Sequence, residues 1–186
     1  LTREIAKRWV NNGHEVTLAS NYLISGDTDY IDQTVIDGSG ANVITIDHLE
    51  NNLSIIGFTI QNGQDGIHLQ GQGLNYRENH HYDNLKIINN SNYGFWAHMY
   101  HRNSMLANTT IKGNGAGGCY LQNQIRFTFY NVTVEENNGT GIYNHQTGWY
   151  LITDSIIRNN IGDGIFTTYW GELVLIIFKL LPKPLL

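Results

Sequence analysis

The chain repeats one ten-residue pattern four times, as IINNSNYGFW (87–96), IKGNGAGGCY (111–120), VEENNGTGIY (134–143) and IRNNIGDGIF (157–166). Each copy begins with an aliphatic residue, has asparagine at its fourth position, and ends with a glycine, an apolar residue and an aromatic residue. The copies start 23 or 24 residues apart. Looser copies begin near residues 36 and 60, so the repeat extends over most of the chain.

A period near 23 residues with short alternating segments fits a coil of about three short strands, because no helical period of 3.6 is present. Stacked coils place equivalent residues about 4.8 Å apart. Aliphatic columns would form the core, and asparagine side chains could hydrogen-bond up the stack in two buried ladders. The predicted core column contains Ile36, Ile60, Ile87, Ile111, Val134 and Ile157. The predicted ladders contain Asn62, Asn90, Asn114, Asn137 and Asn160, and Asn84, Asn108, Asn131 and Asp154.

The composition agrees with an all-β fold and excludes several classes of protein. The 186 residues include 23 asparagines and 20 glycines but only 6 alanines, which argues against a helical bundle. A hydrophobic fraction of 41% argues against disorder. The single cysteine, Cys119, excludes an intrachain disulfide framework and is expected to be a small buried side chain. With a net charge of −5 and no basic patch, nucleic acid is not an expected partner.

The short repeat resembles that of the right-handed parallel β-helix, the pectate-lyase-like superfamily. The resemblance rests on NGQDGIHL (62–69), GNGAGGCYL (113–121), NNGTGIYN (137–144) and NNIGDGIFT (159–167), and on VTLASNYLISGDTDYIDQTVIDGSG (16–40). It implies a right-handed parallel β-helix solenoid of about six to seven coils. It does not define a function, because this scaffold carries lyases, hydrolases, epimerases, adhesins and binding proteins.

The two ends differ from the repeat. Residues 1–15 are predicted to form a short N-terminal capping helix and entry, residues 16–172 the β-helix, and residues 173–186 a hydrophobic C-terminal strand or cap, or a truncated end. The N-terminus also loosely resembles the start of a glycosyltransferase domain. The C-terminal apolar run is too short for a membrane span and would allow end-to-end self-association.

Strand alternation predicts which side chains point outward. The first outward column contains Ile44, His68, Trp96, Tyr120, Tyr143 and Phe166. The second contains Ile46, Gln70, His98, Gln122, His145 and Thr168, and the third contains His48, Gln72, Tyr100, Gln124, Thr147 and Trp170. Aromatic rings offer apolar faces to sugars, and amides and imidazoles bond hydroxyl groups. The predicted substrate-binding residues are His68, Trp96, Tyr100, Tyr120, Gln122, Tyr143 and His145.

Candidate catalytic residues lie near a longer coil, which carries about four extra residues between Gln70 and Tyr82. Arg77 or Arg102 would suit β-elimination from a uronate, as base and as neutraliser of its carboxylate. His98 or His101 would suit general-base work, because histidine titrates near neutrality. Arginine and histidine are also common in surface turns, so a purely structural role stays open.

No metal site or cofactor is expected. His98 and His145 are two coils apart, about 10 Å, which is too far to share one ion. A site that combines His98 with His101, or with His80 and His81, stays open as an alternative. The resemblance to pectate lyases would imply calcium held by clustered aspartates, but the outward columns lack that cluster, and they also lack the paired carboxylates of a hydrolase.

The sequence therefore predicts an extracellular or cell-surface domain that binds a polysaccharide or another glycan along one sheet face. If the domain is an enzyme, the prediction is a lyase-like carbohydrate-active enzyme that acts in a groove on this face. The alternative is a structural or adhesion segment of a larger surface protein or fibre, without catalytic activity.

Overall fold

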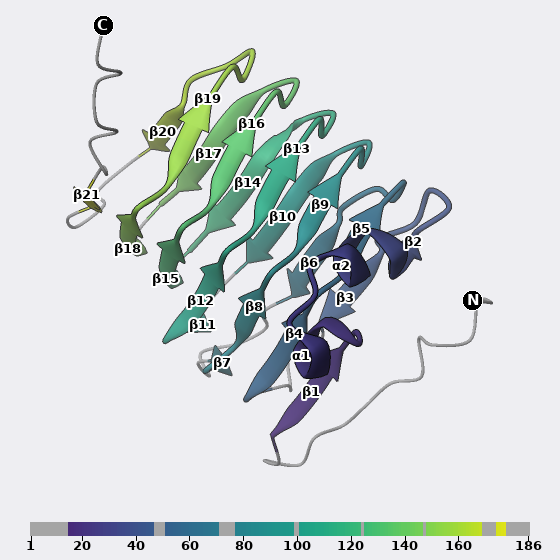
Figure 1. The fold of residues 1–186 in the computed structure, drawn as a ribbon. Coiled ribbons are helices and arrows are strands. Elements are labelled where there is room, and N and C mark those ends of the chain that lie inside the picture. The colour runs from purple at the N-terminus through teal and green to yellow at the C-terminus, as the bar shows by residue number, and fades with distance from the viewer. Residues whose placement is uncertain are drawn as a thin grey trace, which may run out of the picture.

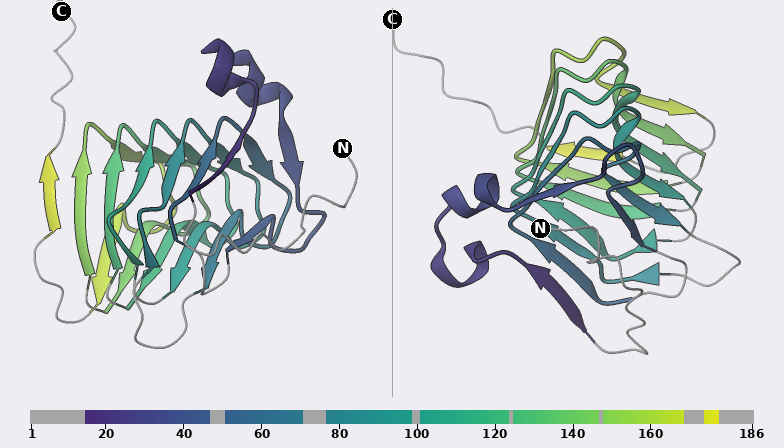
Figure 2. Two further views of the ribbon diagram at one scale, coloured as in Figure 1. Left: turned by 90° about the horizontal axis from the view of Figure 1, so that it is seen from below. Right: turned by 90° about the vertical axis from the view of Figure 1, so that its right-hand side faces the viewer.

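The chain folds into a parallel β-solenoid of about five turns, as a computed structural model shows (Figure 1). The structure describes residues 15–46, 51–70, 77–98, 101–123, 125–146, 148–168 and 174–177, and only the backbone of residues 77 and 174–177. Figure 2 shows the coils stacked in one direction, with the two short helices at the N-terminal end of the stack. The predicted parallel β-helix is confirmed, with about five turns rather than the expected six to seven.

Each turn passes through three parallel sheets, which we name sheets A, B and C in the order the chain visits them. Sheet A contains β1 (Val16–Ala19), β4 (Leu53–Ile56), β8 (His81–Asp83), β12 (Ser104–Ala107), β15 (Ile125–Tyr130), β18 (Gly148–Thr153) and β21 (Val174–Ile177). Sheet B contains β2 (Val35–Asp37), β5 (Thr59–Gln61), β9 (Lys86–Ile88), β13 (Thr110–Lys112), β16 (Thr133–Glu135) and β19 (Ile156–Arg158). Sheet C contains β3 (Ile44–Ile46), β6 (Ile67–Gln70), β10 (Tyr93–His98), β14 (Gly117–Gln122), β17 (Thr140–His145) and β20 (Ile165–Thr168).

A two-stranded sheet, two short helices and a C-terminal strand interrupt or extend the coils. A two-stranded parallel sheet of β7 (Arg77–Glu78) and β11 (His101–Arg102) lies between sheets C and A along the chain. Helices α1 (Tyr22–Ser25) and α2 (Asp29–Gln33) connect β1 to β2. The capping helix predicted within residues 1–15 lies outside the described residues, while β21 adds a parallel strand within the predicted C-terminal segment.

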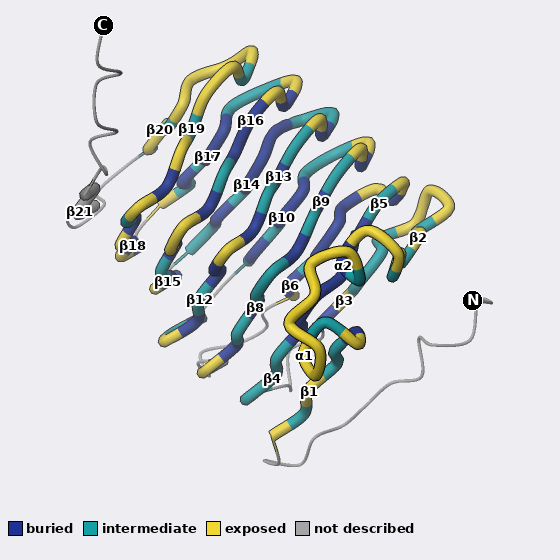
Figure 3. The backbone as a smooth tube through the Cα atoms, in the orientation of Figure 1, coloured by how far each residue is buried: buried dark blue, intermediate teal, exposed yellow. Residues whose placement is uncertain are grey.

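The core is built from the aliphatic column of sheet B and the inward residues of sheets A and C. Ile60, Ile87 and Ile111 are fully buried and Val134 is 1% exposed, whereas Ile157, near the C-terminal end, is only partly buried. Other buried members of the core are Ile67, Phe95, Cys119 and Ile142. Burial raises the pKa of the Cys119 thiol far above its usual range, so this residue is the small buried side chain that its sequence context indicates. Figure 3 shows the buried segments recurring from coil to coil.

A buried asparagine ladder runs along one corner of the solenoid. The Nδ2 group of Asn90 donates to Oδ1 of Asn114 at 3.0 Å, and Asn114 and Asn137 donate in the same way to Asn137 and Asn160 at 2.9 Å. Each Nδ2 of Asn114 and Asn137 also donates to a backbone carbonyl, that of Ile87 or Ile111, so both amide hydrogens are satisfied. The predicted ladder over Asn90, Asn114, Asn137 and Asn160 is confirmed.

Two other asparagine predictions are wrong, and the reason is the backbone of the corners. Asn62 adopts a positive φ of 57°, and its Nδ2 group donates to the carboxylate of Asp37. The next residue, Gly63, takes the ladder position on this coil, because its backbone N–H donates to Oδ1 of Asn90. Asn108 and Asn131 also have positive φ values, and they form an exposed ladder rather than a buried one. Asparagine tolerates this left-handed conformation better than most residues, which explains much of its abundance here.

Candidate functional site

A column of stacked rings lies on the outer side of sheet C. The paired positions of β6, β10, β14, β17 and β20 place the rings in register from coil to coil. The ring centroids of His68 and Trp96 are 4.0 Å apart, those of Trp96 and Tyr120 6.2 Å, and those of Tyr120 and Tyr143 5.3 Å, with planes within 10° of parallel. Phe166 continues the column 5.4 Å from Tyr143. The aromatic column predicted from strand alternation is therefore formed.

A second outward column runs beside the rings. It contains Gln70, His98, Gln122, His145 and Thr168, paired as the sequence predicts. His145 Nδ1 lies 2.9 Å from the hydroxyl of Thr168, and the Trp96 and His98 rings are 5.4 Å apart. We call the two columns, with Thr45 of β3, the sheet C face. The predicted third column lies outside the described residues, including Tyr100.

The first coil departs from the predicted alternation. Ile44 pairs with Ile67 and Ile46 pairs with Leu69, so both isoleucines point inward, and Ile46 is only 5% exposed. Thr45 pairs with His68 and is the exposed residue on this coil. The assignment of Ile44 and Ile46 to the outer face is therefore wrong by one residue, which exchanges the two sides of a strand.

The sheet C face carries no Asp, Glu, Lys or Arg among its described side chains, in contrast to the outer side of sheet B. On sheet B, Glu135 bonds Arg158 at 2.8 Å and Lys112 at 3.1 Å, and Lys86 pairs with Asp32. The hydrogen bond from Arg158, followed by that from Lys112, lowers the pKa of the Glu135 carboxyl. Sheet B therefore resembles an ordinary solvated face, and sheet C does not.

A buried carboxylate holds the histidine at the N-terminal end of the ring column. Asp65 is 2% exposed, and its Oδ2 lies 2.7 Å from His68 Nδ1. Its Oδ1 accepts hydrogen bonds from Asn92 Nδ2 at 2.7 Å and from the backbone N–H of Tyr93 at 3.1 Å. Asp65 is a residue of this site that sequence reasoning missed, although its position three residues before His68 is a signal that could have found it.

Tyr93 is a second residue of this site that sequence reasoning missed. Its ring lies 5.1 Å from that of Tyr120, above Gly117, where a Cβ atom would meet the ring at 3.1 Å. Burial raises the pKa of both Tyr93 and Tyr120, so their hydroxyls stay protonated and can donate hydrogen bonds. Burial, followed by the nearby His68, lowers the pKa of His98, which favours its neutral form.

The residues predicted to be catalytic are only partly brought together. His98 lies on the sheet C face, half-buried. His101 lies in β11 instead, only 1% exposed, with its ring 5.7 Å from the ring of His80. Arg102, the next residue, is half-buried. In the pairing of β11 with β7, His101 lies opposite Arg77, whose side chain is not described. The roles assigned to these residues remain predictions.

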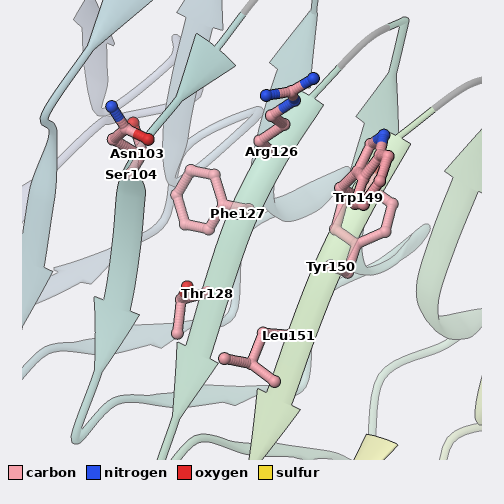
Figure 4. Close-up of a pocket in the computed structure, with 8 residues that line it drawn as sticks. All are labelled: Asn103, Ser104, Arg126, Phe127, Thr128, Trp149, Tyr150 and Leu151. Atoms are coloured by element: carbon pink, nitrogen blue, oxygen red, sulfur yellow. The ribbon is translucent and has the colours of Figure 1, made fainter. Parts of the chain in front are cut away.

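A shallow pocket of about 350 Å³ opens on the outer side of sheet A (Figure 4). Its lining includes Arg126, whose guanidinium lies 5.4 Å from the ring centroid of Trp149. Trp149 is 48% exposed and Leu151 is 37% exposed. This pocket lies on a different sheet from the ring column, so it provides an independent surface for comparison.

The described part of the chain contains neither a cluster of metal ligands nor a membrane-spanning helix. Within it, no group of three or more His, Cys, Asp or Glu side chains is arranged to hold a metal ion. None of its helices has the length and apolar character required to cross a membrane.

Comparison with known proteins supports the fold and does not identify an activity. The family described as the right handed beta helix region matches residues 35–176, which is most of the chain. Neither a curated protein nor a solved structure matches the chain significantly. Three parallel sheets, a buried asparagine ladder and this match agree, and the chain belongs to the right-handed β-helix family.

Proposed function

We propose that this β-helix domain binds a glycan along the sheet C face, outside the cell or on its surface. The observation that carries the proposal is the continuous column of half-exposed rings beside a column of amides and imidazoles. Five rings on successive coils span about 19 Å at the usual strand spacing of about 4.8 Å. A surface of this length would accommodate several sugar residues of one chain.

The polar groups of the face suit hydroxyl-rich ligands. Gln70 and Gln122 can both donate and accept hydrogen bonds, and neutral His98 offers one donor and one acceptor. Because adjacent ring planes are nearly parallel, each ring covers part of its neighbour's face. Ring edges and the hydroxyls of Tyr120 and Tyr143 therefore contribute to the surface together with the partly open ring faces.

The test compares two tryptophans on different sheets. A glycan array identifies the ligand, and its Kd is then measured for Trp96→Ala and for the control Trp149→Ala. Trp96→Ala should weaken binding about tenfold, equivalent to about 1.4 kcal/mol, while Trp149→Ala should change the Kd less than about twofold. The melting temperature confirms that each variant is folded. Loss of binding only in Trp149→Ala, or no glycan bound by the wild type, would contradict the proposal.

A structural or adhesive role is the second candidate, and exposed apolar residues at the C-terminal coils favour it. Ile161 is 78% exposed, Ile156 is 39% exposed, and Phe166 is 39% exposed. Side chains of this kind are candidates for contact with another copy of the chain or with a further segment of a longer fibre. Sedimentation that depends on concentration in the wild type and not in Ile161→Asn, without glycan binding, would favour this role.

A further inference from the structure

The contact between Asp65 and His68 fixes both the orientation and the tautomer of the imidazole ring. Asp65 is buried and its carboxylate receives hydrogen bonds from Asn92 and from the Tyr93 backbone, so it cannot turn away from His68. The His68 ring is also stacked on Trp96 with 4.0 Å between centroids and 10° between planes. Two directions of contact therefore hold the ring, one in its plane and one across its face.

This arrangement determines which nitrogen of His68 carries the proton. An ionised carboxylate only accepts hydrogen bonds, so Nδ1, at 2.7 Å from Asp65 Oδ2, must be the donor. In a neutral imidazole the other nitrogen, Nε2, then has a free lone pair. The side chain of His68 is 18% exposed, which leaves part of the ring open to solvent or to a ligand.

We propose that His68, oriented by Asp65, is a general base that hydrolyses a carboxylic ester carried by a sugar hydroxyl of a glycan on the sheet C face. This inference rests on the proposed glycan binding and adds a reaction to it. His68 is the catalytic residue, because its Nε2 would contact the attacking water. Asp65 is a positioning residue that acts through the His68 tautomer.

The reaction uses only the ester, one water molecule and the imidazole of His68. As the oxygen of water bonds to the ester carbonyl carbon, His68 Nε2 takes a proton from that water, and the C=O electron pair moves to the carbonyl oxygen. The C=O bond then re-forms, and the bond from the carbonyl carbon to the sugar oxygen breaks. That oxygen takes the proton from His68 Nε2, so the products are a sugar hydroxyl and a carboxylic acid, and His68 is neutral again.

Ester hydrolysis fits the groups around His68 because it requires only one proton acceptor. Glycosidic hydrolysis usually uses two carboxyl groups flanking the scissile bond, and the buried carboxylate of Asp65 is already occupied by three donors. The titratable groups that interact with His68 are Asp65, at 2.7 Å, and His98. Neutral His98 is a donor on this face that could stabilise the developing oxyanion.

The test combines a direct readout of the tautomer with a rate. The ¹⁵N chemical shifts of the His68 ring report its tautomer, and 4-nitrophenyl acetate serves as the ester probe. Asp65→Asn keeps the size of the side chain but lets its amide donate to His68 Nδ1, which should move the ring proton to Nε2. The second variant is His68→Gln, and the control is His81→Gln, on the outer side of sheet A.

The wild-type ring should carry its proton on Nδ1, and Asp65→Asn should reverse this. Ester hydrolysis should fall at least about tenfold in Asp65→Asn and His68→Gln and should persist in His81→Gln. A proton on Nε2 in the wild type, or equal rates in wild type and His68→Gln, would overturn the inference. Glycan binding without hydrolysis would overturn it alone, whereas hydrolysis without glycan binding would overturn the proposed function.

Discussion

At the scale of single residues, the buried amides of the asparagine ladder satisfy one another and the backbone of the coil corners. Asn114 illustrates this: its Oδ1 accepts from the backbone N–H and from Nδ2 of Asn90, at 3.0 Å each. Its Nδ2 donates to the Ile87 carbonyl and to Asn137. A single side chain therefore ties three coils together at a position without access to water.

The first prediction concerns this residue. Asn114→Leu leaves several buried donors and acceptors without partners, so the free energy of unfolding should fall by about 1–3 kcal/mol or more. Asn138→Ala, at an exposed position nearby, is the control and should change stability by less than about 0.5 kcal/mol. Denaturant unfolding measures both values. Equal stability of Asn114→Leu and wild type would contradict a buried, fully bonded ladder.

The second prediction concerns pH and His98. Burial lowers its pKa in the folded state below the ordinary value of 6.5, so the unfolded chain binds more protons there. Its contribution to stability is therefore present above about pH 6.5 and is lost as the pH falls through that value toward the lower folded pKa. His98→Gln should lose less stability than the wild type between pH 7 and pH 5, as urea titrations at each pH would show. Parallel curves for the two proteins would exclude this contribution.

At the scale of elements, a column of glycines at or near the start of the sheet C strands, Gly66, Gly94, Gly118, Gly141 and Gly164, permits the close approach of sheets B and C. A Cβ atom at Gly118 would meet Val134 and would lie 2.5 Å from the carbonyl oxygen of Gly141, on the next coil. At Gly164, on the last coil of the same column, the nearest contact would be an ordinary 3.7 Å to Ile157. The requirement for glycine therefore comes from the neighbouring coils rather than from the strand itself.

The third prediction uses this pair of positions. Gly118→Ala should destabilise the protein by about 1–3 kcal/mol, because the new methyl group has no space. Gly164→Ala should be nearly neutral, within about 0.5 kcal/mol. Thermal or chemical unfolding of both variants measures the difference. Similar losses in both would mean that backbone conformation, not crowding, selects glycine here.

The same elements show what could be predicted from the sequence. Glycine and aliphatic residues recur in phase from coil to coil, so the repeat and its inward column were predictable. The first coils were not predictable in the same way, because Gly66 lies three positions after Gly63, whereas Gly94 lies four positions after Asn90. That one-residue difference misplaced Asn62 in the ladder. The bond between Asp65 and His68 depends on side-chain orientation, which periodicity does not contain.

At the scale of the whole molecule, the three outer faces differ in chemistry. Sheet B carries ion pairs, sheet A carries the pocket with Arg126 and Trp149, and sheet C carries rings, amides and imidazoles. The chain has a net charge of −5, yet the described side chains of the sheet C face include no permanently charged group. Binding there should depend on shape and hydrogen bonding more than on electrostatic attraction.

The fourth prediction follows from that contrast. Raising the salt concentration from about 0.1 M to about 1 M shortens the screening length from about 10 Å to about 3 Å. The Kd for a neutral glycan should change less than about twofold over this range, because no ion pair is screened. Calorimetric titrations at both salt concentrations would measure the change. A loss of affinity of tenfold or more would indicate a charged surface elsewhere on the molecule.

The most direct test of the central claim is an NMR titration of the ¹⁵N-labelled protein with a glycan selected on the array. If the sheet C face is the binding site, the largest shifts will occur at the Trp96 indole N–H and at the amides of β10, β14 and β17. The ion-paired strands of sheet B will change little. Shifts concentrated at the Trp149 indole and Arg126 of sheet A would contradict the account.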